Sequence, residues 1–199
     1  MSARVVLLCG PSGSGKTHIA TRSGLPVFRL DDFSQDGDDP TMPCSAELGI
    51  LDWDDVRAWH ADRAVAALVT VCREGAVEVP TYSISTNRAD GASVFRLDGA
   101  PALVAEGVFA AEIVEACRQR GILADAIVLR RAPWKNFVRR FARDLAEHRK
   151  PPRTLWRRGR ILMRDEPATV ARATALGCRP VGARDLAVVL RHVAADAPA

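Results

Sequence analysis

Short apolar runs alternate with longer segments of mixed apolar and charged residues along this chain. The apolar runs predict buried strands at 4–9, 26–30, 102–107, 125–130 and 186–190. The longer segments predict helices at 52–75, 110–120, 134–148 and 154–175, and two more apolar runs predict a hairpin at 76–80 and 93–97. Strands that alternate with helices predict an α/β fold, in which a parallel sheet is covered on both faces to give three layers. Ligands of such sheets bind at the carboxyl ends of the strands.

Length and composition indicate one soluble globular domain over residues 1–199, with 48% hydrophobic and 26% charged residues. No apolar run approaches the roughly 20 residues that a membrane helix requires, so we expect no membrane partner. The five cysteines are scattered without the spacing of a zinc site, which is typical of reduced thiols in the cytoplasm. The tail at 194–199 is predicted to be disordered.

Positive charge is concentrated in one part of the chain. Residues 130–164 hold 13 of the 28 Lys and Arg residues and only two acids, Asp144 and Glu147. This segment therefore carries a charge of +11, and the rest of the chain carries −7 within a total of +4. A basic block in an otherwise acidic protein either faces an anion or forms a solvated helix surface.

The sequence GPSGSGKT follows the first predicted strand and matches the phosphate-binding pattern G-x-x-x-x-G-K-[ST]. Glycines allow backbone N–H groups to turn toward phosphate oxygens, and the helix that follows adds a favourable dipole. Lys16 is expected to reach the β- and γ-phosphates of ATP, and Thr17 is expected to ligate Mg²⁺. The predicted nucleotide contacts are Gly10, Ser12, Gly13, Ser14, Gly15, Lys16 and Thr17.

Three classes of protein use such a loop. A GTPase switch needs a D-x-x-G sequence and an N-K-x-D sequence, and the nearest match, NRAD at 87–90, follows no apolar strand. A motor ATPase needs a strand that ends in aspartate before a catalytic glutamate, whereas the strand at 102–107 ends with Glu106 alone. A small-molecule kinase needs a base for the acceptor hydroxyl, a pocket for the acceptor and cations over the phosphoryl group, and the chain has candidates for all three.

Six motifs occur in the order and spacing of one family. They are GPSGSGKT, LDDF, LDWDDV, VEVPTYS, VAEGVFA and RRFARDLAEHRK. With them the chain resembles the uridine kinase family of P-loop kinases, which is itself similar to phosphoribulokinase and bacterial pantothenate kinase. The resemblance covers residues 4–150 and implies a P-loop NTPase fold with an arginine-bearing helical lid at about 139–160.

The resemblance implies roles for individual residues. It implies that Asp31 is the base that accepts the proton of the acceptor hydroxyl, and a carboxylate at the end of the second strand suits this role. It implies that Tyr82 packs against a nucleoside and that Glu106 lies near Mg²⁺. It also places Arg140 and Arg143 in the lid, where guanidinium groups pair with phosphate oxygens.

The chain departs from the family in its acceptor site. Asn87 stands where the family has a histidine, and the aspartate that commonly holds the sugar hydroxyls falls near Gly49. Arg88 is a candidate cation on the acceptor side, and Asn87 and Arg88 complete the predicted substrate contacts together with Asp31, Tyr82 and Arg140. These departures put uridine itself in question.

Several alternatives stay open from sequence. Asp31 and Asp32 could simply cap a turn, and Asp36, Asp38 and Asp39 are expected to be solvated loop acids. The acceptor is predicted to be a uridine- or cytidine-like nucleoside, with a pantothenate-like or sugar-phosphate-like metabolite as the alternative. A nucleotide-dependent nucleic-acid-binding protein that uses 130–164, and a nucleotide sensor without catalysis, are rival functions. Uridine kinases are often oligomeric, so a homo-oligomer is compatible with the resemblance.

Overall fold

The computed structural model describes residues 2–46, 49–146 and 151–195. The tail predicted to be disordered therefore falls mostly outside the described residues, and its first two residues, Ala194 and Ala195, end the last helix. No helix in the described part of the chain is long and apolar enough to cross a membrane.

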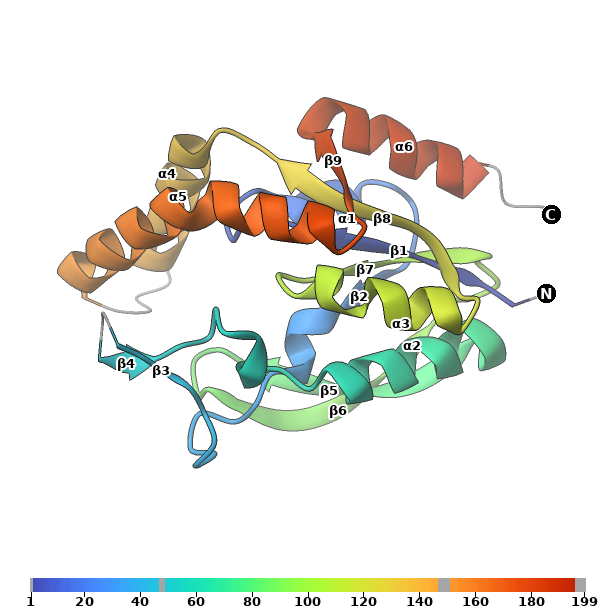
Figure 1. Cartoon of the computed structure of the whole chain (residues 1–199). Coiled ribbons are helices and arrows are strands. Elements are labelled where there is room, and N and C mark those ends of the chain that lie inside the picture. The colour runs from blue at the N-terminus through green and yellow to red at the C-terminus, as the bar shows by residue number, and fades with distance from the viewer. Residues whose placement is uncertain (1, 47–48, 147–150, 196–199) are drawn as a thin grey trace.

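Five parallel strands form the central sheet, in the order β2-β7-β1-β8-β9 (Figure 1). Their bounds are β1 Arg4–Cys9, β2 Val27–Arg29, β7 Ala102–Glu106, β8 Leu123–Arg130 and β9 Arg179–Gly182. The central strand β1 pairs with β7 on one side, where Leu8 lies opposite Glu106, and with β8 on the other. The segments that follow β1, β2 and β7 consequently begin side by side at one edge of the sheet.

The alternation of side chains along β1 explains why helices cover both faces. Val5 and Leu7 belong to a core that contains residues of α2 (Ala61–Glu74) and α3 (Val114–Gln119). Val6 and Leu8 point the other way, to a second core with residues of α1 (Lys16–Thr21) and α6 (Ala183–Ala195). A strand with both faces buried reads as a continuous apolar run, so the three-layer α/β fold predicted from sequence is confirmed.

Two sequence-based expectations about elements were wrong. The run at 186–190 is not a strand but part of α6, because Leu186 and Leu190 are four residues apart and both fully buried on one helix face. The last strand is β9 instead. The helix expected at 52–75 begins only at Ala61, because Asp55 caps the short 3₁₀ turn η2 (Val56–Ala58) and the next residue, Trp59, is extended.

The expected hairpin is present and is longer than predicted. It pairs β5 (Ala76–Ser83) with β6 (Arg88–Arg96) in antiparallel register. The remaining short elements are the 3₁₀ turns η1 (Leu30–Phe33) and η3 (Ala110–Ile113) and the strand pair β3 (Cys44–Ser45) and β4 (Ile50–Leu51).

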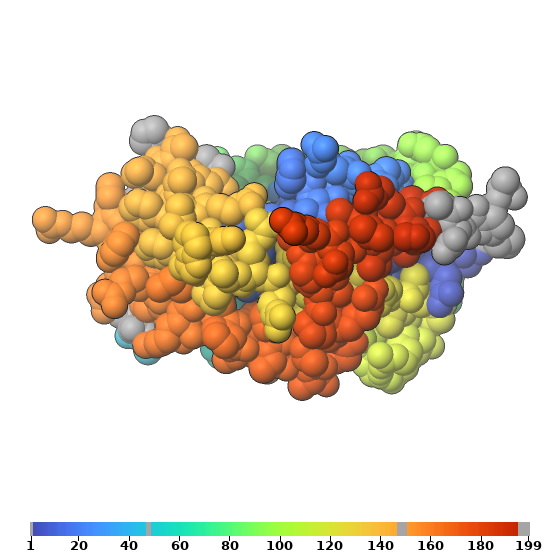
Figure 2. Space-filling view, turned by 90° about the horizontal axis from the view of Figure 1, so that it is seen from above, coloured from blue at the N-terminus to red at the C-terminus, as the bar shows by residue number. Residues whose placement is uncertain are grey.

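Two helices, α4 (Pro133–Ala146) and α5 (Pro152–Ala175), lie side by side at one end of the molecule (Figures 1 and 2). We call these helices the lid; residues 147–150 of the lid predicted at 139–160 lie outside the described residues. The helices touch closely, since a Cβ on Gly159 of α5 would lie 2.6 Å from the Phe137 ring. Phe137 and Phe141 stack, and both meet Trp156 edge to face.

The face of α4 that packs inward is polar. Its buried residues are Asn136, Arg140 and Asp144, spaced four apart on one side of the helix. Its large apolar side chains are more exposed: Trp134 is 59% exposed and Val138 is 53% exposed. The structure buries Arg140, so this polar face of α4 lies against the phosphate-binding loop.

Candidate active site

The phosphate-binding loop, Gly10 to Thr17, joins the end of β1 to α1 as predicted. Lys16 is buried within it and donates a hydrogen bond of 2.8 Å to the carbonyl oxygen of Gly10. This bond holds the ammonium group inside the loop, where a phosphate oxygen could take the place of the carbonyl. Ser14 Oγ is buried without a hydrogen-bond partner among the described residues, which leaves a polar group in the loop for a ligand.

Helix α4 of the lid is built directly against this loop. Gly13 has a φ of 81°, and a Cβ there would lie only 2.7 Å from the Asn136 carbonyl oxygen and 2.9 Å from Arg140 Cβ. Arg140 donates a 3.0 Å hydrogen bond to the Ser12 carbonyl oxygen. The base of the lid and the loop are therefore one packed unit, and only glycine fits at residue 13.

Thr17 and Glu106 meet at the edge of the sheet. Thr17 Oγ1 donates a hydrogen bond of 2.8 Å to Glu106 Oε1. Burial raises the pKa of Glu106 above its ordinary value, Lys16 opposes this shift, and the negative charge of Asp31 adds to it. The Glu106 carboxylate and the Thr17 hydroxyl present oxygen atoms of the kind that Mg²⁺ prefers, and Mg²⁺ commonly uses one or two carboxylates together with substrate phosphates. The residues thus fit the predicted metal, and a cation would relieve the repulsion between the carboxylates.

Asp31 lies in η1, directly after β2, and faces the segment that follows β7. Its Oδ1 accepts a hydrogen bond of 3.2 Å from the Val108 backbone N–H. A Cβ on Gly107 would lie 2.8 Å from the same oxygen, so glycine lets the two segments approach. Its neighbour Asp32 points elsewhere, toward Arg29 at 3.5 Å, and burial raises the pKa of Asp32. The two adjacent aspartates are therefore unequal.

The acids that follow in this loop, Asp36, Asp38 and Asp39, bond to other parts of the protein. Asp38 forms an ion pair of 2.8 Å with Arg88, and Asp36 accepts a hydrogen bond from the Ala89 backbone N–H. Asp39 accepts from Thr41. The contacts of Asp36 and Asp38 join this loop to the hairpin, and Arg88, paired with Asp38, is not among the residues that line the cavity described next.

A cavity of about 530 Å³, which we call the outer compartment, opens beside the phosphate-binding loop. Its lining brings together predicted site residues from distant parts of the sequence: Ser12, Asp31, Tyr82, Asn87, Arg140 and Arg143. Sequence reasoning missed Trp53, whose ring meets Tyr82 edge to face at 5.9 Å in the same wall. Burial raises the pKa of Tyr82 to about 12. Its hydroxyl donates to the Gln35 carbonyl oxygen.

Each arginine in the wall of the outer compartment has an acidic partner. Arg143 contacts Asp144 at 2.7 Å, and Arg158 of α5 contacts Asp54 at 2.6 Å. Arg140 lies 3.9 Å from Glu166. Burial lowers the pKa of Arg140 and raises the pKa of Glu166, and Asn136 donates a 2.9 Å hydrogen bond to the other Glu166 oxygen. The Asp54–Arg158 pair joins the lid to the segment before α2 and was not foreseen from sequence.

Arg139 of the lid lies close to Gly15 of the phosphate-binding loop. A Cβ on Gly15 would lie 3.2 Å from Arg139 Nη2, and Arg139 has no hydrogen bond or ion pair among the described residues. Burial lowers the pKa of Arg131, and the positive charge of Arg139 nearby lowers it further. The signal in the sequence was the pair of adjacent arginines, which cannot show which one faces the loop.

Comparison with solved structures identifies the type of fold. No protein-family model matches the chain, and no curated protein matches its sequence. Among solved structures, a candidate fructose transport system kinase from Silicibacter sp. TM1040 is 17% identical, with a TM-score of 0.60 over 85% of each chain. A candidate uridine kinase from Bacillus stearothermophilus is 18% identical, with a TM-score of 0.48 over 74% of this chain and 82% of that one. The chain therefore has a P-loop kinase-like fold, as its motifs predicted.

Proposed function

We propose that this protein is an ATP-dependent kinase that phosphorylates a hydroxyl group of an uncharged small molecule, such as a nucleoside. The observation that carries the proposal is the position of Asp31. Its carboxylate lines a cavity of about 530 Å³ that Ser12 of the phosphate-binding loop also lines. A base, a phosphate-binding loop and room for an organic acceptor are thus adjacent.

Each part of the site has a task in phosphoryl transfer. Lys16 and the loop amides bind the β- and γ-phosphates, and Thr17 with Glu106 would hold Mg²⁺, which neutralises charge on the phosphates. Asp31 accepts the proton of the acceptor hydroxyl, and its bond from the Val108 N–H orients it. Arg139, which has no ion pair among the described residues, supplies positive charge from the lid, and Arg140 and Arg143 hold the lid against Ser12 of the loop. The lid excludes water that would otherwise hydrolyse ATP.

The charges of the outer compartment support an uncharged acceptor. Its three arginines, Arg140, Arg143 and Arg158, are paired with acids, as described above. A phosphorylated or carboxylated acceptor would need a cation without a partner, because burying an unpaired anion is costly. Trp53 and Tyr82 offer instead an aromatic wall for a planar or apolar group. These contacts favour a nucleoside-like acceptor over a pantothenate-like or sugar-phosphate-like one.

The test is acceptor-dependent release of ADP from ATP and Mg²⁺. The panel contains uridine, cytidine, neutral sugars, pantothenate and sugar phosphates, with single-stranded RNA as a non-acceptor. We expect stimulation by an uncharged member and none by RNA. Stimulation only by an anionic member would refute the uncharged acceptor, and no stimulation by any member, with ATP still bound, would favour a nucleotide sensor.

A further inference from the structure

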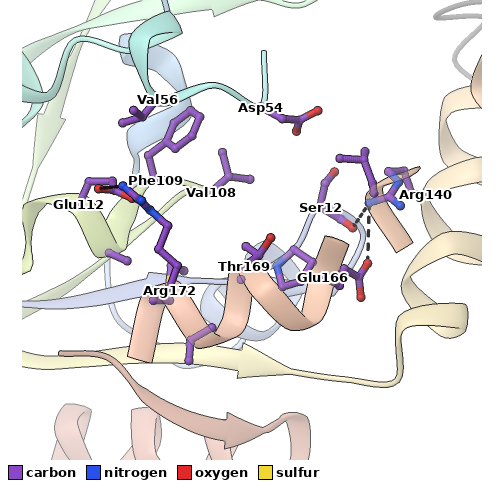
Figure 3. A pocket seen from close by; sticks show the side chains of 17 residues that line it. Ser12, Asp54, Val56, Val108, Phe109, Glu112, Arg140, Glu166, Thr169 and Arg172 are labelled. Atoms are coloured by element: carbon purple, nitrogen blue, oxygen red, sulfur yellow. Dashed lines mark hydrogen bonds and ion pairs between the residues drawn. The ribbon is translucent and has the colours of Figure 1, made fainter. Parts of the chain in front are cut away.

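A second cavity, of about 310 Å³, adjoins the outer compartment, and we call it the inner compartment (Figure 3). It lies over the ends of β1 and β8, between the segment that follows β7 and helix α5. Its walls are mostly apolar. Among its lining residues are Val56, Val108, Phe109, Val128, Leu162 and Ala173, and the charged side chains Asp54, Glu112, Arg140, Glu166 and Arg172 also line it. A pocket of this size, with mostly apolar walls and a few polar groups, is typical of a small-molecule site, so its shape points to a ligand.

An ion pair lies at each of two opposite ends of the inner compartment, as Figure 3 shows. Arg172 of α5 donates two hydrogen bonds, of 2.8 and 2.9 Å, to Glu112 in η3. At the other end, Arg140 faces Glu166 at 3.9 Å. The charges are therefore paired with one another, and the space between them offers apolar surface with the Thr169 hydroxyl at its rim. Such a space suits an uncharged, apolar group.

The inner compartment is continuous with the site of Asp31. Both compartments are lined by the same six residues, Ser12, Asp54, Val108, Phe109, Arg140 and Leu162. Val108 is the link, because its backbone N–H holds the Asp31 carboxylate while the residue also lines the inner compartment. A molecule with its hydroxyl at Asp31 would enter the inner compartment by passing Val108 and Phe109.

We propose that the acceptor carries, in addition to its reacting hydroxyl, an uncharged apolar substituent that occupies the inner compartment. The substituent is an alkyl, acyl or aryl group, so the preferred acceptor is longer and more apolar than a plain nucleoside or sugar. This inference rests on the proposed kinase function, since it extends the same acceptor site.

A homologous series of probes tests it. Methyl, butyl and hexyl β-D-ribofuranosides are uncharged, carry hydroxyl groups and differ only in the apolar chain. Their dissociation constants are measured by calorimetry with the full chain, Mg²⁺ and a non-hydrolysable ATP analogue, and their phosphorylation is measured in parallel. Each methylene that enters an apolar site should tighten binding about fourfold. Equal affinities along the series, or no binding by any member, would overturn the inference.

Two matched variants test where the alkyl group of the probe binds. Thr169 and Thr174 are both exposed on α5, and each hydroxyl bonds the carbonyl four residues earlier. Only Thr169 lines the inner compartment. Thr169→Trp places a ring in the compartment and should abolish the gain per methylene, whereas Thr174→Trp should retain it. If the increase in affinity per methylene persists in Thr169→Trp, the alkyl group binds elsewhere and the inference is overturned.

The same data separate this inference from the kinase function. Phosphorylation of the methyl riboside together with flat affinities would leave the kinase standing and reject the inner compartment. A chain-length gain that Thr169→Trp abolishes, without phosphorylation of any acceptor, would support the compartment as a binding site and reject the kinase. Phosphorylation and the gain together support both.

Discussion

Thr17 Oγ1 donates a 2.8 Å hydrogen bond to Glu106 Oε1, and this bond ties the first helix to the end of β7 across the sheet edge. Burial raises the pKa of Glu106, so the folded protein keeps the proton of the Glu106 carboxyl group at a pH where the unfolded chain has lost it. Between the ordinary and the raised pKa the folded state binds more protons. The contribution of Glu106 to stability is therefore full at low pH and is lost as the pH rises through the raised value.

Glu106→Gln should consequently stabilise the protein without ligand at neutral pH, because the buried charge is removed while Thr17 keeps a partner. The free energy of unfolding, measured by urea denaturation, should be higher for Glu106→Gln than for the wild type at neutral pH. This difference should shrink as the pH falls to the ordinary pKa of a carboxyl group. With saturating Mg²⁺ and ATP the order should reverse, since only the wild type holds the metal well. Glu78→Gln, at an exposed position of β5, is the control and should change neither quantity. Destabilisation by Glu106→Gln at neutral pH would contradict the expectation.

Asp31→Asn should remove the proposed base while it keeps the shape of the side chain and the bond from the Val108 N–H. Acceptor-dependent turnover should fall by roughly 10²–10⁴-fold, the usual size of a general-base contribution. ATP affinity should change little, because Asp31 faces the acceptor. The control is Asp38→Asn, which alters an acid of the same stretch that pairs with Arg88. Loss of turnover in both variants alike would assign the effect to the loop and not to a base.

Adjacent arginines of the lid should behave differently. Arg139→Ala removes a cation that has no partner among the described residues beside Gly15, so ATP affinity should fall about 10- to 100-fold with little change in stability. Arg140→Ala leaves Glu166 buried without its cation and breaks the bond to the Ser12 carbonyl oxygen. The free energy of unfolding should then fall by about 3 kcal/mol. Calorimetric titration with ATP and urea denaturation separate the two effects, and a loss of stability in Arg139→Ala would contradict this assignment.

The sequence predicted the parts of the site that depend on local pattern. The phosphate-binding loop follows β1 and Asp31 lies just after β2, and the carboxyl ends of parallel strands meet at one edge of the sheet. The sequence could not predict contacts that join distant segments, such as Arg158 with Asp54 or Trp53 with Tyr82, because these depend on how the lid and hairpin pack. The same dependence on packing decides which side chains of α4 are buried.

In α4 the resemblance placed Arg140 and Arg143 in the lid near the phosphates, but the sequence could not show which polar side chains the helix buries. The structure buries Asn136 and Arg140, because Glu166 accepts a hydrogen bond from Asn136 and the Ser12 carbonyl oxygen accepts one from Arg140. The strand predicted at 186–190 was wrong for another reason. Apolar runs of five residues fit both a strand and a helix, and only packing of Leu186 and Leu190 against the sheet decides between them.

Gly13→Ala should separate the lid from the phosphate-binding loop. The new Cβ would lie 2.7 Å from the Asn136 carbonyl oxygen, so α4 must move or the loop must distort. Gly24→Ala is a matched control, because Gly24 has a φ of 84° against 81° for Gly13, yet a Cβ there meets no atom within 4 Å. Backbone strain from a left-handed alanine should therefore be similar in both variants, at about 1 kcal/mol.

The difference between the two variants reports the lid contact alone. Gly13→Ala should lose a further 1–3 kcal/mol or so in the free energy of unfolding, the usual cost of overpacking, and should also bind ATP more weakly. Gly24→Ala should bind ATP as the wild type does, because its loop lies away from the site. Urea denaturation and calorimetry measure both quantities. Equal losses of stability in the two variants would mean that α4 does not rest on Gly13, and the packed unit of loop and lid would then have to be abandoned.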